Sequence, residues 1–388
     1  MKQRILHHTI STSGVVRPTQ VEVNLDRLAA NYRAIKDHVA PAKMMPVVKA
    51  NAYGHGMVRA ARLYQSLGAD CIGVAVLEEG ILLRESQITI PILVMGGILG
   101  NQVPHFLKHD LTLAASSIER LGQIDDAAGR MGLRARVHLK IDTGMERIGV
   151  HYYNTEPFLE TALSCENVDV EGIFSHFANA ESTDLNHARL QLRRFQDVLG
   201  FYDRRGVPRP RLCHMANSGA ILQLPEACFD MVRPGILLYG VYPSADVPKN
   251  IQVRPALSWK SRVVYFKIIR PGHPVGYGST WVSDHPVHAV TVPAGYGDGY
   301  FRSMSGKAKV ILRGKRYPVI GAISMDQIVV NLESDSAYSD DEVVLIGEMD
   351  GKSITCEDLA EWAGTIPYEI LTNINTRVPR VYSGGTSA

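Results

Sequence analysis

The segment MMPVVKANAYGHG places a lysine, Lys49, directly at the end of a run of apolar residues. Lysine is rarely fully buried unless it is paired or functional. At the end of a buried strand, desolvation disfavours the ammonium form, and the neutral amine is a nucleophile that can form a Schiff base. We therefore interpret Lys49 as a candidate nucleophile. The alternative is a lysine whose apolar stem packs on the protein while its charge reaches solvent.

Two later segments have the composition of an anion site. Asn217 and Ser218 open a short predicted helix, whose first N–H groups attract negative charge, and Gly235 with Ile236 offers backbone that a ligand can approach closely. A lysine beside such a phosphate site fits either an aldolase for phosphorylated sugars or an enzyme that holds pyridoxal phosphate. These residues alone leave both open, and Ser218 could also be a helix N-cap that binds nothing.

The elements that must position these residues alternate between short apolar strands and amphipathic helices from residue 44 to about 240. Strands that are apolar throughout, each followed by a helix, indicate a parallel sheet covered by helices. Eight such units predict a (β/α)₈ barrel, with active-site groups at the carboxyl ends of the strands. A doubly wound open sheet is the alternative, but the first strand is not followed by a GxGxxG turn. The strand candidates are 45–49, 71–76, 92–96, 111–115, 136–142, 170–176, 211–215 and 230–235.

After residue 250 the pattern becomes one of alternating strands with Gly and Pro turns. It predicts a mainly-β domain. We place the barrel at 15–250 and the β domain at 251–388, with residues 1–14 packing on the β domain. The early strand TQVEVNL either caps the barrel or joins the β domain.

The composition argues for a small-molecule partner. The chain has 388 residues, and 41 Lys and Arg against 39 Asp and Glu give a formal charge of +2. This balance argues against binding to nucleic acid or to an anionic membrane. The five cysteines are scattered, no metal-ligand spacing occurs, and the N-terminus has no apolar stretch typical of a signal peptide. We expect a cytoplasmic protein with reduced thiols and no metal site.

Nine segments in order resemble one family, the alanine racemases. They are VVKANAYGHG, HLKIDTGMERIG, FSHF, HMANS, MVRPGILLYG, VGYGSTW, AGYGDGY, GAISMDQ and IPYEIL. The resemblance implies a pyridoxal-phosphate enzyme with a (β/α)₈ barrel followed by a β domain, working as a homodimer whose active sites are shared between subunits.

The same resemblance implies a role for each site residue. Lys49 would carry the cofactor as an internal aldimine and be one acid/base group, and Tyr277 of the partner subunit would be the second. His176 would orient the tyrosine, and Arg147 would contact both the cofactor and the substrate carboxylate. Lys140 matches a lysine that is carbamylated in some members. The other cofactor-binding residues would be Tyr53, Asn217, Ser218, Arg233, Gly235, Ile236 and Tyr368, and the other substrate-binding residues Tyr296, Met325 and Asp326.

Arg233 matches the arginine that faces the pyridine nitrogen. A guanidinium can only donate hydrogen bonds, so it weakens the ring as an electron sink, as a racemase requires. One departure from the family pattern is Glu146, a carboxylate that could compete for its neighbour Arg147.

The resemblance thus implies an isomerase that interconverts L- and D-alanine and supplies D-alanine for peptidoglycan. One alternative is a racemase with different or broader specificity, for example for serine or lysine. Another is a non-catalytic pyridoxal-phosphate carrier, although such carriers lack the β domain and its tyrosine. A decarboxylase would place an acidic residue where this chain has Arg233.

Overall fold

The computed structural model describes residues 17–385, which divide into two compact units. The barrel domain is Arg27–Arg254, and the β domain joins residues 17–26 to residues 255–385. Between residues 17 and 385 we find no helix with the length and apolar character needed to cross a membrane.

The barrel domain is built on eight parallel strands in chain order around a ring. From the second strand onward each pairs with the next, and the last strand pairs with the first. The ring closes between the first two strands through a parallel bridge from Val47 to Gly73. The predicted (β/α)₈ barrel is therefore confirmed. Its strands are β2 (Lys43–Met44), β3 (Ile72–Val74), β4 (Ile92–Val94), β5 (Thr112–Ala115), β6 (Ala135–Asp142), β8 (Val168–Phe174), β9 (Leu212–His214) and β10 (Met231–Val232), and β7 (Val150–His151) pairs beside β6.

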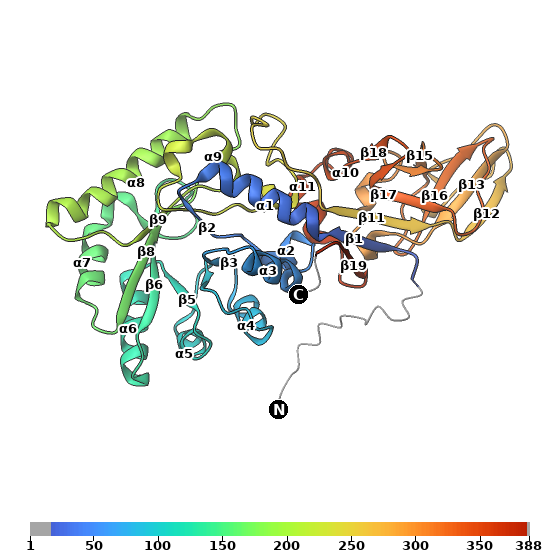
Figure 1. Cartoon of the computed structure of the whole chain (residues 1–388). Helices are drawn as coiled ribbons and strands as arrows, with labels where there is room; N and C mark the ends of the chain where they lie inside the picture. Colours follow the sequence, from blue (N-terminus) through green and yellow to red (C-terminus); the bar gives the residue numbers. More distant parts are fainter. Residues whose placement is uncertain (1–16, 386–388) are drawn as a thin grey trace. The chain divides into compact units, whose positions relative to one another are not determined.

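Helices follow the strands on the outside of this domain (Figure 1). Their ends follow local capping rules: Ser117 accepts a hydrogen bond from the amide of Arg120 at one helix start, and Gly132 ends that helix in the left-handed conformation. The helices are α1 (Leu25–Val39), α2 (Lys49–Tyr53), α3 (Met57–Ser66), α4 (Leu77–Glu85), α5 (Val103–Lys108), α6 (Ile118–Met131), α7 (Glu156–Ser164), α8 (Asn186–Arg205) and α9 (Ser218–Gln223), with 3₁₀ turns η1 (Gly100–Gln102), η2 (Tyr152–Asn154), η3 (Pro225–Ala227) and η4 (Ile236–Tyr239).

The β domain is a mostly antiparallel sheet in the order β12-β13-β16-β15-β14-β17-β11-β1-β19, with β18 paired to β17. The predicted mainly-β character is confirmed. The strands are β1 (Gln20–Asn24), β11 (Leu257–Arg262), β12 (Tyr265–Ile269), β13 (Val287–Val292), β14 (Lys309–Leu312), β15 (Lys315–Ile320), β16 (Ile328–Glu333), β17 (Glu342–Met349), β18 (Lys352–Ile354) and β19 (Arg380–Ser383); the helices are α10 (Cys356–Ala363) and α11 (Pro367–Asn373), with η5 (Tyr277–Ser279), η6 (Tyr296–Asp298) and η7 (Arg302–Met304).

Of the two placements left open for the N-terminal strand, the structure shows the second, in which it joins the β domain. β1 lies between β11 and β19, with Val23 opposite Leu257 on one side and Tyr382 on the other. Its hydrogen bonds therefore tie residues 17–26 to the β domain, although the sequence-based bounds gave 15–26 to the barrel. The expected packing of residues 1–14 lies outside the described residues.

We predict that Val23→Ala destabilises the β domain. The side chain is fully buried, and losing its methyl groups in a closed site should lower the free energy of unfolding by about 2 kcal/mol. Gln20→Ala at the outer part of the same strand is the control, with an expected change within about 0.5 kcal/mol. Urea unfolding followed by circular dichroism measures both, and equal stability of the two variants would contradict the placement of β1.

Candidate active site

Lys49 follows the first barrel strand and begins α2. Burial lowers the pKa of its ammonium, the positive charges of Arg147 and Arg233 lower it as well, and the carboxylate of Glu79 acts in the opposite direction. A lowered pKa increases the fraction of neutral amine, which is the nucleophilic form. The structure therefore gives Lys49 the environment of a reactive lysine.

The backbone after Lys49 is left-handed for four successive residues, none of which is glycine. Ala50, Asn51, Ala52 and Tyr53 have φ values of 51°, 55°, 54° and 51°. This conformation costs roughly 1–2 kcal/mol per residue for L-amino acids, so other contacts must hold it. One is the Asn51 Oδ1 atom, which accepts a hydrogen bond from the amide of Met57 at 2.9 Å.

The turn brings Tyr53 against Gly235 and Ser218. A Cβ atom added to Gly235 would lie 2.6 Å from the Tyr53 hydroxyl oxygen and 3.9 Å from Ser218 Oγ. Ser218 Oγ accepts hydrogen bonds from the amides of Gly235 (2.9 Å) and Leu237 (3.3 Å). Two hydroxyls and backbone amides thus surround a point where only glycine fits, which suits a phosphate group.

The neighbouring Asn217 is the helix cap. Its Oδ1 accepts a hydrogen bond from the Ala220 amide at 3.0 Å, and Ser218 is the first residue of α9. The alternative in which Ser218 is the helix N-cap is therefore wrong, because Asn217 satisfies that amide, and the Ser218 hydroxyl accepts the amides of Gly235 and Leu237 instead.

Arg233 is the centre of the buried polar groups, with only 3% of its surface exposed. Its Nη1 donates to His214 Nδ1 at 2.7 Å. Its Nη2 lies within hydrogen-bonding distance of the carbonyls of Ser175 (2.8 Å) and Met215 (3.1 Å) and of His176 Nδ1 (3.2 Å). Burial lowers the pKa of Arg233 to about 9, which still leaves the guanidinium protonated at neutral pH.

This guanidinium fixes the tautomers of three histidines. Arginine has no acceptor, so Nδ1 of both His214 and His176 must be unprotonated and accept. The proton of neutral His214 is then on Nε2, which donates to His138 Nδ1 at 2.7 Å. Burial lowers the pKa of all three rings, to about 3 for His138, and Arg233 lowers it further, so all three are neutral.

Lys140 is buried beside this cluster, with its Nζ atom 4.5 Å from the ring centre of Phe174. Burial and the charge of Arg233 hold its pKa well below the usual value. Asp142 opposes this, but both of its oxygens already accept backbone amides, among them that of Arg147 at 3.1 Å. Lys140 is therefore an amine in a cationic surrounding rather than half of an ion pair.

The loop after β6 carries Arg147 at the surface. Its neighbour Glu146 lies with Oε2 3.7 Å from Nδ1 of His151, and both side chains are largely exposed. The carboxylate thus faces His151 in this structure, contrary to the expectation that Glu146 could compete for Arg147.

The remaining predicted residues belong to the β domain. Tyr277 is 74% exposed on η5, between two glycines with positive φ, and Met325 is 52% exposed. The backbone of residues 275–276 packs on residues 321–322, and Gly295 packs on the carbonyls of residues 324–325, so these exposed side chains come from loops that touch. Asp326 pairs with Arg377 at 2.8 Å, Tyr296 begins η6, and Tyr368 lies on α11.

The barrel therefore holds Lys49, Tyr53, Lys140, His176, Ser218, Arg233 and Gly235, while the β domain holds Tyr277, Tyr296, Met325, Asp326 and Tyr368. The contacts above join Tyr53 and Ser218 at Gly235 and join His176 to Arg233, whereas Lys49 and Lys140 are related to Arg233 through its charge. Sequence reasoning missed His138 and Glu79 as parts of this site. His138 stands two residues before Lys140 in one strand, a spacing that places both on the same face, and this was the available signal.

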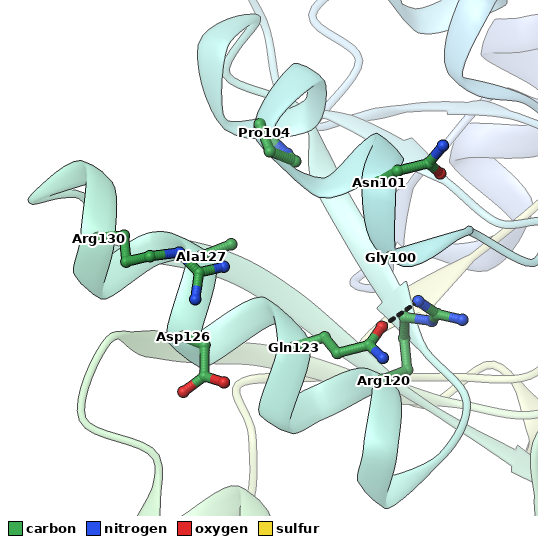
Figure 2. A pocket seen from close by; sticks show the side chains of 8 residues that line it. All are labelled: Gly100, Asn101, Pro104, Arg120, Gln123, Asp126, Ala127 and Arg130. Atoms are coloured by element: carbon green, nitrogen blue, oxygen red, sulfur yellow. Dashed lines mark hydrogen bonds between the residues drawn. The ribbon is translucent and has the colours of Figure 1, made fainter.

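A pocket of about 410 Å³ lies elsewhere, on the outer helices of the barrel (Figure 2). It is lined by η1, α5 and α6, where Arg120 donates to Gln123. None of the predicted site residues lines it, so we do not assign the chemistry to this pocket.

Comparison with known protein families gives matches in both domains. A family model described as "Alanine racemase, N-terminal domain" matches residues 23–243, and one described as "Alanine racemase, C-terminal domain" matches residues 256–382. "Alanine racemase" of Carboxydothermus hydrogenoformans is 42% identical over 95% of this chain and 100% of that protein. "Alanine racemase 2" of Caldanaerobacter subterraneus subsp. tengcongensis is 42% identical over 95% of each chain.

Solved structures agree with the sequence matches. Alanine racemase from the D-cycloserine producer Streptomyces lavendulae superposes with a TM-score of 0.92 at 38% identity, covering 96% of this chain and 99% of that one. Alanine racemase from Bacillus anthracis, solved with bound L-Ala-P, gives a TM-score of 0.90 at 32% identity and covers 96% of each chain.

We predict that the neutral histidine cluster makes the protein sensitive to acid. Below pH 6.5 these histidines become protonated in the unfolded chain but stay neutral in the folded protein. The free energy of unfolding therefore falls as the pH decreases towards the folded pKa, which is about 3 for His138. Three such rings contribute a slope of up to about 4 kcal/mol per pH unit.

His138→Asn should reduce that slope by about 1.4 kcal/mol per pH unit. Urea unfolding at several pH values between 7.5 and 5 measures it. His105→Gln, on the exposed side of α5, is the control and should leave the slope unchanged, because its ring lies outside the cluster. A slope for His138→Asn as steep as that of the unmodified protein would show that this ring is not kept neutral.

Proposed function

The chain belongs to the alanine racemase family and is an isomerase that interconverts L- and D-alanine, and from this premise we propose that its barrel binds pyridoxal phosphate through Lys49. The observation that carries the proposal is a half-buried lysine of lowered pKa in the same barrel as a cup of hydroxyls and amides. We further propose a cytoplasmic location and a supply of D-alanine for peptidoglycan, as expected for the family.

The residues present fit the cofactor. Tyr53, Ser218, Gly235 and Ile236 would hold the phosphate, with Asn217 shaping the helix start, because a side chain at Gly235 would fill the space between the two hydroxyls. Tyr368 of the β domain is proposed to add a further hydroxyl. Once bound, the cofactor would withdraw electrons from the Cα atom of alanine and so acidify its C–H bond.

Arg233 is proposed to face the pyridine nitrogen. Within the described residues, its Nε–H and one Nη1–H make no hydrogen bond, whereas the rest of the guanidinium is occupied. A donor at the ring nitrogen disfavours its protonation and limits how much charge the ring accepts. Return of the proton to Cα would then be favoured over side reactions, as racemisation requires.

Inversion at Cα requires acid/base groups on both faces, because a single group tends to return the proton to the face from which it came. We propose Lys49 for one face and Tyr277 for the other. On this scheme Tyr277 removes the Cα proton of L-alanine and Lys49 donates a proton to the opposite face, and the roles reverse for D-alanine. His176 would orient the phenol, and Arg147 with the Met325 amide would bind the substrate carboxylate.

We propose a homodimer in which Tyr277 serves the partner's barrel. The support is that the side chains of Tyr277 and Met325 are exposed on loops of the β domain that touch each other. Exposed apolar and aromatic side chains that lie together are typical of a surface that contacts another molecule. Tyr296 and Asp326 would line the substrate's access corridor from the same surface.

Lys140 is proposed to carry a carbamate. Its amine, held neutral by burial, would attack the carbon of CO₂, form a C–N bond and lose a proton. The carbamate is an anion, whereas the protonated lysine is a cation. The modification would therefore replace repulsion between Lys140 and the guanidinium groups of Arg147 and Arg233 by attraction.

We predict that Lys49→Ala abolishes cofactor capture. The unmodified protein, as purified, should show the visible band of bound pyridoxal phosphate, and borohydride should fix the cofactor mass on the peptide that contains Lys49. Lys49→Ala should lose the band and reduce racemisation by at least about 10³-fold. Lys43→Ala, at an exposed lysine on the preceding strand β2, should retain both. A Lys49→Ala protein with an unchanged spectrum would refute the assignment.

We also predict that two inactive variants restore each other. Tyr277→Phe should stop racemisation and slow deuterium exchange at Cα of L-alanine more than at Cα of D-alanine, because the lysine face remains. Mixing Tyr277→Phe with Lys49→Ala should produce heterodimers in which one site is intact. Recovery of up to about a quarter of the activity is expected for random exchange of subunits. No recovery, with exchange verified by mass spectrometry, would argue against shared sites.

A further inference from the structure

Glu79 binds two different loops at the carboxyl edge of the barrel. It is a half-buried residue in the first turn of α4. Its Oε1 accepts a hydrogen bond from the amide of Ala50 at 2.6 Å, and its Oε2 accepts from the amides of Ala75 (2.8 Å) and Val76 (3.4 Å). A single carboxylate thus joins the loop after the first barrel strand to the loop after the second.

The position of this contact matters because Ala50 is where the chain changes handedness. Ala50 directly follows Lys49 and is the first of the four left-handed residues. The two strands that lead into these loops are themselves paired through Val47 and Gly73. Glu79 therefore continues the connection between neighbouring strands beyond the sheet, up to the peptide that carries the reactive lysine.

Glu79 is also an anion among cations. The charged groups that act on Lys49 are Arg147 and Arg233, which disfavour its ammonium form, and Glu79, which favours it. His176 also faces Lys49, but its ring is neutral. Glu79 is thus the carboxylate that opposes the two arginines at this lysine.

We propose that Glu79 is a positioning residue for Lys49: its carboxylate holds the left-handed turn through the Ala50 and Ala75 amides, and so sets the direction of the lysine and of Tyr53. Glu79 touches neither reacting atom and acts through the backbone. The inference rests on the proposed role of Lys49 and extends it to the group that holds this lysine in place.

Glutamine is the informative replacement. An ionised carboxylate accepts on both oxygens, whereas an amide offers one oxygen and one NH₂ group. In Glu79→Gln the side-chain oxygen can accept from the amides of one loop, and the NH₂ group then lies against an amide N–H of the other loop. One contact is therefore lost with almost no change in volume. The matched control is Glu78→Gln, an exposed carboxylate one residue earlier in the same helix turn.

The primary measurement is hydrogen exchange on the full-length protein as purified. In Glu79→Gln, exchange at the amide of Ala50 or at that of Ala75 should accelerate by about tenfold or more, the effect expected for loss of a hydrogen bond to a charged group. Amides of β13 in the other domain should not change. In Glu78→Gln all of these amides should exchange as in the unmodified protein. Unchanged exchange at both Ala50 and Ala75 in Glu79→Gln would overturn the proposal.

The second measurement is the pH profile of racemisation. Removing the carboxylate should move the limb assigned to Lys49 to lower pH by about half a unit or more, since only the arginines then act on the lysine. Glu78→Gln should leave the profile in place. A reduced rate with an unshifted limb would overturn the positioning role.

Two further outcomes keep the tests separate. If Glu79→Gln loses protection throughout the chain, Glu79→Asp replaces it: its shorter side chain can reach one loop only, so one of the two amides should lose protection, and retention of both contradicts the proposal. If the unmodified protein shows no pyridoxal band, the proposal that it binds pyridoxal phosphate is refuted. Hydrogen exchange at Ala50 and Ala75 still decides whether Glu79 holds the turn.

Discussion

The barrel site depends on the burial of one guanidinium among neutral acceptors. Arg233 is surrounded by two carbonyls and two imidazoles instead of a carboxylate. Such a group keeps its charge only because each neighbour presents a lone pair to it. That requirement decides the proton positions on His176 and His214, and through His214 that on His138. The electrostatic character of the site is therefore set by one residue at the end of β10.

The eight-stranded barrel brings the other residues of the proposed site close to Arg233. Lys49, Lys140, His176 and Arg233 stand at or just after the ends of different strands, and a parallel barrel brings all such ends to one face. Burial lowers the pKa of Lys49 and Lys140, and cations that are far apart in the chain are then close enough to lower it further. The fold supplies the proximity, and the low polarity of the interior makes the proximity effective.

Much of this could be predicted from the sequence, because strand ends are visible as the point where an apolar run stops. That rule was sufficient for the number and order of the eight strands. The first strand was expected at 45–49 but is Lys43–Met44, so Lys49 lies at the start of α2 and not at a strand end. The rule failed for features that depend on contacts between loops: the Glu79 contact joins residues 29 positions apart, and four left-handed residues without glycine have no local signature. The placement of the N-terminal strand was left open because its pattern suits either domain, and only its pairing with β11 and β19 decides.

The left-handed turn also has a stereochemical consequence. Its cost arises from the clash of an L-configured Cβ atom with the following carbonyl oxygen, and a residue of the opposite chirality does not meet that clash. Ala50 and Ala52 are both alanines in this conformation. The backbone beside Lys49 therefore has the geometry that D-alanine prefers, so a chemically synthesised chain with D-alanine at these two positions would adopt the turn without the steric penalty that the natural chain must offset by its contacts.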